Sequence, residues 1–164
     1  MVNFFIIADL NCKVLYSEVY NFSEASKHKV DVTSNIVQQV KKEFDFNFAS
    51  STDVDCSISD FDSNGIFNVK VQESLKPTVW HSFRGCLYIL VCDDTDNRVL
   101  AARTLIIIIR TLRDILKPNT LADFLSGADV ISLILNTILP SGQLLFLHNQ
   151  AVQQITKDIQ RLAK

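Results

Sequence analysis

The segment 85–118, with the sequence GCLYILVCDDTDNRVLAARTLIIIIRTLRDILKP, constrains the fold of this chain more than any other. Residues 85–93 are apolar enough for a central β-strand. The polar turn that follows holds Asp96 and Asn97, either of which can cap a helix, and Pro118 ends that helix. Its apolar side is one wide stripe, made of Val99, Leu100, Thr104, Leu105, Ile108, Leu112, Ile115 and Leu116. A strand joined directly to such a helix predicts a helix buried on most sides and packed on a sheet.

The start of the chain predicts a β-hairpin. Residues 3–8 and 13–20 are rich in β-branched and aromatic residues, and Asp9 and Asn11 between them suit a tight turn. Apolar residues that alternate with polar ones, or form short runs, predict further strands at residues 66–72, 78–83 and 85–93. We therefore expect a sheet of about five strands.

Three further helices complete the prediction. Ser23 and Glu24 suit the start of the first, although Thr33 or Ser34 could equally cap it. Apolar residues recur there at helical intervals, at Val30, Ile36, Val37, Val40 and Phe44. The other two helices are expected at about residues 128–139, ended by Pro140 and Gly142, and from Asn149 onward.

The order of elements is then β-β-α-β-β-β-α-α-α, which predicts an α+β sandwich with helices flanking a central antiparallel sheet. With 164 residues the chain fits one domain, residues 1–164. Residues 47–65 are acidic, rich in serine and free of lysine and arginine, which predicts a long, solvated and flexible loop within that domain.

The charge balance makes nucleic acid an unexpected direct partner. Sixteen basic against eighteen acidic residues give no broad positive field of the kind that phosphate backbones or anionic lipids attract. Because the start of the chain has no basic leader and the longest apolar run is far shorter than a membrane span, we expect a cytoplasmic protein without a transmembrane segment. The four cysteines form no CxxC pair and are expected to be free thiols: Cys12, Cys56, Cys86 and Cys92.

No motif in the sequence predicts catalysis, a metal site or a cofactor. Asp60, Asp62, Asn64 and Gly65 match the first half of an EF-hand calcium loop, but Val71 stands where the bidentate carboxylate is needed. A solvated turn is the better interpretation. The three histidines lie in separate segments, at His28, His81 and His148. The sequence contains neither a GxSxG elbow nor a glycine-rich phosphate loop. We therefore predict a protein that is not an enzyme.

An unbroken apolar row follows the turn at Pro140 and Gly142. It consists of Leu144, Leu145, Phe146 and Leu147. Four consecutive residues cannot all face one way on a strand or a helix, so at least one pair should point away from the core. Two of the four could instead belong to a buried edge strand joining two helices. We therefore predict that the row, Leu144, Leu145, Phe146 and Leu147, binds a partner, which covers the pair that faces outward.

Three stretches carry a resemblance to a known family. They are KVLYS at residues 13–17, TVW at residues 78–80 and, above all, LPSGQLLFLHNQAVQ at residues 139–153. Together with the apolar first strand and the acidic DN turn before the long helix, they resemble the small, or sigma, subunits of clathrin-adaptor complexes. Within that family the sequence is most similar to the sigma chains of the fifth adaptor complex. The resemblance covers almost the whole chain apart from the acidic loop.

The resemblance implies a longin-like (profilin-like) fold and a non-enzymatic subunit of a heterotetrameric adaptor. In that family the sigma chain packs on the solenoid of a large chain, here of the zeta type, beside a large beta chain and a medium mu chain. Spatacsin and spastizin are indirect partners. The implied setting is cytoplasmic, peripheral on late endosomes and lysosomes, with membrane contact only through the partners and a role in endosome-to-Golgi retrieval.

Other sigma chains help to bind acidic dileucine signals, so the resemblance also suggests a cargo pocket in this chain. It implies Gly85 and Leu87 as pocket walls. Leu15 stands where several sigma chains have a basic residue, and Arg110 lies on the long helix where the pocket is usually apolar. Dileucine binding is therefore an open question for this chain.

Two other functions fit the predicted fold. One is a longin or roadblock-type module of a tethering or exchange-factor complex, which would not require the sequence GQLLFLHNQ. The other is a small-molecule sensor of the profilin or PAS-like sort, which needs a pocket with a few convergent polar groups. An adaptor subunit without its large partner should expose apolar surface and tend to self-associate.

Overall fold

A computed structural model describes residues 1–20, 29–51, 57–117 and 121–162 of the chain. Its centre is a five-stranded sheet in the order β2-β1-β5-β4-β3, and every neighbouring pair of strands is antiparallel. The predicted hairpin and the three later strands are confirmed. The bounds are Phe4–Asp9 for β1, Val14–Val19 for β2, Asn64–Val71 for β3, Ser74–Phe83 for β4 and Cys86–Val91 for β5.

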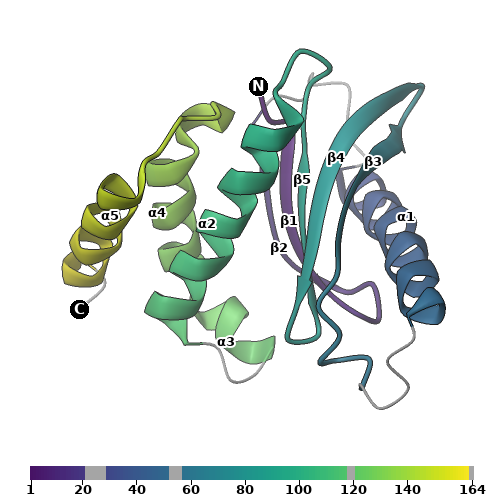
Figure 1. Ribbon diagram of the computed structural model, residues 1–164, viewed down its shortest axis with the longest axis horizontal. Coiled ribbons are helices and arrows are strands. Elements are labelled where there is room, and N and C mark those ends of the chain that lie inside the picture. Colours follow the sequence, from purple (N-terminus) through teal and green to yellow (C-terminus); the bar gives the residue numbers. More distant parts are fainter. Residues whose placement is uncertain (21–28, 52–56, 118–120, 163–164) are drawn as a thin grey trace.

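Helices cover both faces of this sheet (Figure 1). Helix α1, Lys29–Ser50, lies on one face, and helices α2, Arg98–Leu116, and α4, Ala128–Ile138, lie on the other. Helix α5, Asn149–Leu162, packs on α2 and α4 at the outside of that layer. The α+β class and the flanking helices are as predicted.

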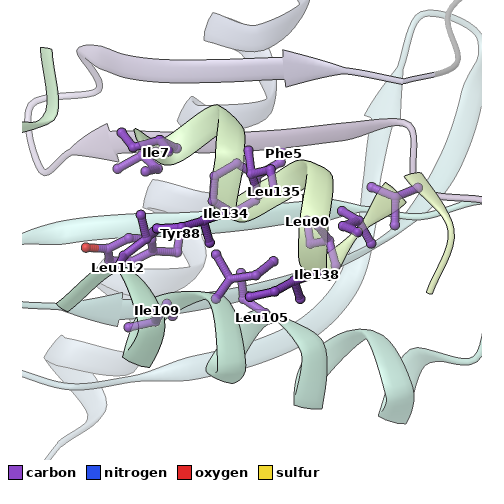
Figure 2. Close-up of a cluster of buried hydrophobic side chains, with 14 of the residues drawn as sticks. Phe5, Ile7, Tyr88, Leu90, Leu105, Ile109, Leu112, Ile134, Leu135 and Ile138 are labelled. Atoms are coloured by element: carbon purple, nitrogen blue, oxygen red, sulfur yellow. The ribbon is translucent and has the colours of Figure 1, made fainter. Parts of the chain in front are cut away.

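The alternation of side chains along each strand divides the core into two clusters. Phe5 and Ile7 of β1 point toward α2 and α4, whereas Phe4 and Ile6 point toward α1. Figure 2 shows the first cluster, in which Leu105, Ile109 and Leu112 of α2 meet Ile134, Leu135 and Ile138 of α4 above the sheet. Because both faces are covered, β1 and β5 are buried along their whole length.

Helix α1 differs from the prediction at both ends. Thr33 and Ser34 lie inside the helix and do not cap it, and Ser23 and Glu24 lie outside the described residues. The helix continues to Ser50, into the predicted loop. Aromatic packing accounts for this extension, because Phe48 near its end lies 5.2 Å from the ring of Phe61.

The segment between α1 and β3 is therefore shorter than predicted, while most of its described residues are exposed, as expected of a solvated loop. It runs from residue 51 to residue 63, of which 52–56 are not described. Phe61 packs against the α1 side of the core, and the Ser82 hydroxyl donates to the Phe61 carbonyl at 3.0 Å. The Asn47 amide donates to Ser63 Oγ at 3.1 Å. These contacts hold the second half of the segment against the sheet.

The prediction missed helix α3, Leu121–Ser126. Its six residues make less than two turns, too few for a helical period to show in the sequence. Phe124 is its buried anchor, with its ring 6.4 Å from that of Tyr88. The observed order of α-helices after the sheet is thus α2, α3, α4 and α5, with a 3₁₀ turn before the last.

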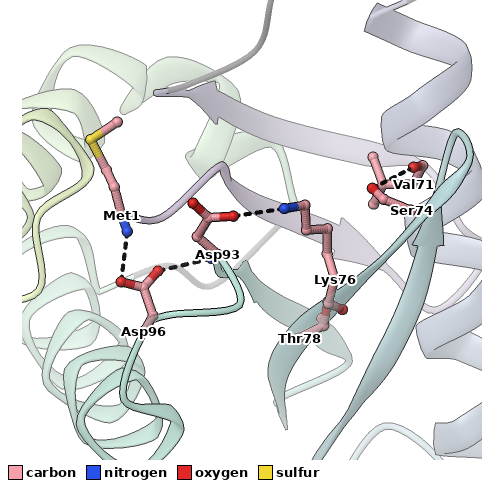
Figure 3. A network of polar contacts seen from close by, with 7 residues as sticks. All are labelled: Met1, Val71, Ser74, Lys76, Thr78, Asp93 and Asp96. Atoms are coloured by element: carbon pink, nitrogen blue, oxygen red, sulfur yellow. Dashed lines mark hydrogen bonds and ion pairs between the residues drawn. The ribbon is translucent and has the colours of Figure 1, made fainter.

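The turn between β5 and α2 is polar and caps the helix, as predicted, and it also takes part in a network of polar contacts with Met1 and Lys76 (Figure 3). Asn97 is the cap, and its Oδ1 accepts hydrogen bonds from the amides of Val99 and Leu100 at 3.0 Å each. Asp96 accepts from the Asp93 amide at 2.8 Å and from the Met1 amino group at 2.6 Å. Lys76 Nζ lies 2.6 Å from Asp93, and this bond lowers the pKa of the Asp93 carboxyl.

Three of the four cysteines are free, as predicted, and Cys56 lies outside the described residues. In the described part of the chain, no helix is both long and apolar enough to cross a bilayer.

Burial should protect two of these thiols from alkylation. Burial raises the pKa of Cys86 to about 11 and that of Cys92 to about 12. Since the thiolate is the nucleophile, we expect both to react with iodoacetamide at pH 8 at least about a hundredfold more slowly in the native than in the unfolded protein. Half-buried Cys12 should react faster than either. Mass spectrometry of timed alkylation measures this, and rapid native labelling of Cys92 would contradict it.

Candidate protein-interaction site

A tight turn fixes the start of the apolar row. The 3₁₀ turn Pro140–Gly142 follows α4, and the Gly142 carbonyl accepts a hydrogen bond from the Val2 amide at 2.8 Å. Gly142 has φ +78, in the left-handed region that favours glycine. A Cβ there would lie 2.8 Å from both Tyr20 Cβ and the Val2 carbonyl oxygen. Only glycine therefore fits this junction between the end of α4 and the start of the chain.

The four apolar residues divide into an inner and an outer pair. Leu144 and Leu147 are half-buried and pack against the core cluster beneath α2 and α4. Leu145 and Phe146 point outward and are 36% and 78% exposed. The expectation that one pair faces away from the core is confirmed. Residues 143–148 form no strand, so the edge-strand interpretation is wrong.

Arg103 of α2 holds the row in place. Its Nη2 donates to the Leu147 carbonyl at 3.2 Å, so this carbonyl has a hydrogen-bond partner although the row is not part of a strand. Its guanidinium carbon lies 5.2 Å from the centre of the Phe146 ring, within range of a cation–π contact. Phe146 is thus a large exposed ring with a supporting cation on one side. We use the name outer pair for Leu145 and Phe146.

His148 connects the row to the last helix. Its Nδ1 accepts a hydrogen bond from the Ala151 amide at 3.0 Å, and its carbonyl accepts one from the Val152 amide at 3.1 Å. These bonds satisfy two amides of the first turn of α5. The row is therefore tied at Gly142, at Arg103 and at the start of α5, so the outer pair is displayed from an ordered segment.

A second exposed feature, which the sequence analysis missed, lies on α2. Val99, Arg103, Ile106 and Arg110 recur at helical intervals on its outward side, and we call them the outer α2 stripe. Val99 is 77% and Ile106 39% exposed. The prediction that Val99 belongs to the buried stripe of this helix is therefore wrong, because Val99 lies on its outward side. The sequence signal for it is the same spacing of three and four residues that indicates the buried stripe, applied to the opposite face of the helix.

Ile106 also lines a cleft of ≈ 110 Å³ between α2 and the β3–β4 edge of the sheet. Ile66 of β3 and His81 of β4 are among its other walls. Burial lowers the pKa of His81, so its imidazole is held toward the neutral form. The cleft is small and mainly apolar.

The residues implied as cargo-pocket walls lie elsewhere. Gly85 is in the β4–β5 turn with φ +72, and Leu87 is fully buried on the α1 side of the sheet. The register pairs Cys86 with Asp9 and Val91 with Phe4, which puts Gly85 and the row at opposite ends of β5. The structure does not bring the two predicted sites together. Their role in cargo binding stays a prediction.

Comparison with known proteins gives similarities in sequence and in fold. The family model described as AP-5 complex subunit sigma-1 matches residues 33–160. The human protein AP-5 complex subunit sigma-1 is 40% identical over 86 residues, which is 51% of this chain and 42% of that protein. The match thus spans less than half of the human relative.

A further similarity is structural. A chain in a homology model of the full-length AP-3 complex, in a stretched open conformation, aligns with a TM-score of 0.65. The alignment covers 99% of this chain and 94% of that one at 11% sequence identity. At that identity the likeness shows a common fold, in line with the longin-like prediction.

Proposed function

Because this chain belongs to the AP-5 complex subunit sigma-1 family, we propose that it is the small subunit of a heterotetrameric adaptor complex in vesicle trafficking. The proposal gives the chain no catalytic role. Its work is to bind a large subunit and complete the assembly, and the family match and the shared fold support this.

The finer form of the proposal names the partners and the place. The large partner is a zeta-type chain, with a beta and a mu chain completing the complex and spatacsin and spastizin joining indirectly. The complex works on late endosomes and lysosomes, in the retrieval of cargo toward the Golgi. The partners supply membrane attachment to a chain with a nearly even charge balance.

One observation carries the proposal: the exposed outer pair on an ordered segment. An aromatic ring that is 78% exposed and stands on a segment tied at Gly142, at Arg103 and at the start of α5 gives up less conformational entropy on binding than one on a free loop. Interfaces are enriched in such aromatic anchors, and an exposed apolar pair gains free energy when a partner covers it. A longin or roadblock-type module of a tethering or exchange-factor complex would share the fold but has no need of this segment.

Affinity purification of the tagged full-length chain from cells, followed by mass spectrometry, tests the proposal. We expect zeta, beta and mu chains in near-equal amounts. Recovery of tethering or exchange-factor subunits would replace the proposal with that alternative. Recovery of neither set would contradict both and favour the small-molecule sensor.

A further inference from the structure

The outer α2 stripe alternates apolar and basic residues along a straight line. Val99, Arg103, Ile106 and Arg110 fall at intervals of four, three and four residues, so the line is about 16 Å long at 1.5 Å per residue. Apolar side chains on a soluble surface are common singly. An ordered repeat of apolar and basic groups on one helix is a more specific pattern.

The positive charge of the stripe is not neutralised within the described part of the chain. Helix α2 holds four arginines and one acidic residue, Asp114, which pairs with Arg113 at 3.1 Å. No ion pair involves Arg103 or Arg110 among the described residues. The whole chain has a formal net charge of −2, so this basic surface is local.

The stripe and the outer pair form one continuous surface. Arg103 belongs to the stripe and also lies 5.2 Å from the ring of Phe146. On its other side the stripe borders the cleft between α2 and the sheet, where Ile106 and Ile66 are both walls. In Figure 1 α2 lies between the α4–α5 pair and the sheet, the two parts of the fold that supply these neighbours.

We propose that this surface binds an acidic, amphipathic helix of the large subunit. The inference rests on the proposed function and adds the chemistry of the contact. A straight row of side chains is complemented by a second helix lying along it. Arg103 and Arg110 are seven residues apart, so the partner helix presents two carboxylates about 10 Å apart, with an apolar residue between them against Ile106. The outer pair and Ile106 supply the apolar contact area.

An anionic membrane is the other surface that attracts arginines, and the stripe fits it less well. Recognition of anionic lipid takes clusters of four to eight basic residues, whereas this stripe has two. Pairing of arginine with carboxylate is bidentate and depends on geometry, which suits two arginines at a fixed spacing. Phosphatidylserine vesicles therefore serve as a competing probe in the test.

Charge reversal provides the first arm of the test. Arg110 has no hydrogen bond or ion pair with the described residues, so R110E should fold normally. In titrations of the purified full chain against the complex of the other three subunits, we expect about tenfold weaker binding for R110E and about a hundredfold for R103E/R110E. The steep salt dependence of the unmodified chain should be lost in the double variant.

The matched control is K42E, which makes the same charge change on α1, across the sheet. It should bind within about twofold of the unmodified chain. Thermal unfolding by circular dichroism separates misfolding from lost contact, since R103E also loses the bond to the Leu147 carbonyl.

Zero-length cross-linking provides the second arm. R110K keeps the charge but adds an amine that carbodiimide joins to a nearby Asp or Glu. We expect a cross-link to an acidic residue of the large subunit, identified by mass spectrometry.

Unchanged affinity of R103E/R110E, or cross-links only to the beta or mu chain, would overturn the inference. Arginine-dependent binding to phosphatidylserine vesicles without the cross-link would overturn it in favour of lipid. Failure of the unmodified chain to bind the complex at all would instead overturn the proposed function.

Discussion

Replacing Leu145 and Phe146 together with aspartate is expected to abolish co-purification with the large subunit while the domain stays folded. Covering the exposed parts of these two side chains, which are 36% and 78% exposed, contributes roughly 2–3 kcal/mol. The double substitution removes that contribution and adds two carboxylates to a surface where they must be desolvated. We therefore expect binding to weaken by at least roughly a hundredfold. Because both side chains point outward, the melting temperature should fall by only a few degrees at most.

Two other variants make this result specific. Leu75 is an exposed apolar residue at the start of β4, so L75D makes the same chemical change elsewhere and should co-purify normally. Leu144 and Leu147 pack on the core, so L144D/L147D should lower the stability of the isolated chain itself. Normal recovery of the large subunit with the L145D/F146D variant would show that the row only connects α4 to α5.

Gly142→Ala is expected to destabilise the domain by about 3 kcal/mol, because backbone strain and a steric clash act together. The left-handed conformation at φ +78 costs an alanine about 1 kcal/mol. Its Cβ would also lie 2.8 Å from the Val2 carbonyl oxygen, which is backbone and can move away only by shifting the start of β1. For a domain of this size we expect the melting temperature to fall by about 6–12 °C.

Differential scanning fluorimetry of the purified chain measures this loss. The neighbouring Gln143 is exposed and has extended backbone angles, so Q143A serves as the control and should change stability by less than about 0.5 kcal/mol. An unchanged melting temperature for Gly142→Ala would mean that the junction between the turn and Val2 adapts easily. In that event the junction would not be what positions the row.

Long periodic segments made most of the fold predictable. The buried stripe of α2 spans five turns, so its period was plain in the sequence, whereas the structure decided between Asp96 and Asn97 as its cap. The six residues of α3 carry no such period, and that helix is stabilised by tertiary contacts such as that of Phe124 with Tyr88. The extension of α1 to Ser50 depends on the ring of Phe61, thirteen residues past Phe48 in the chain, which no local pattern can reveal.

The candidate site was predicted as a stretch of residues but not as a surface. The composition of the row showed that some of its members must face outward. Which members do so depends on tertiary packing: Leu144 and Leu147 pack against the core cluster, and Arg103, more than forty residues earlier, donates to the Leu147 carbonyl. The outer α2 stripe was missed because an outward helical face can be recognised as part of a binding surface only when the residues beside it are known. Phe146 on one side and Ile66 on the other supply those neighbours.

The sequence by itself determined the order and type of the long elements, a helix cap at Asp96 or Asn97 and the family. These features depend on residues close together in the chain, where side-chain period and capping chemistry act directly. Only the tertiary structure decided which half of the row is free for a partner, and that Arg103 joins it to α2. The physical reason is that exposure is a property of packing: a leucine or a phenylalanine is available for binding only where the rest of the chain has left it uncovered.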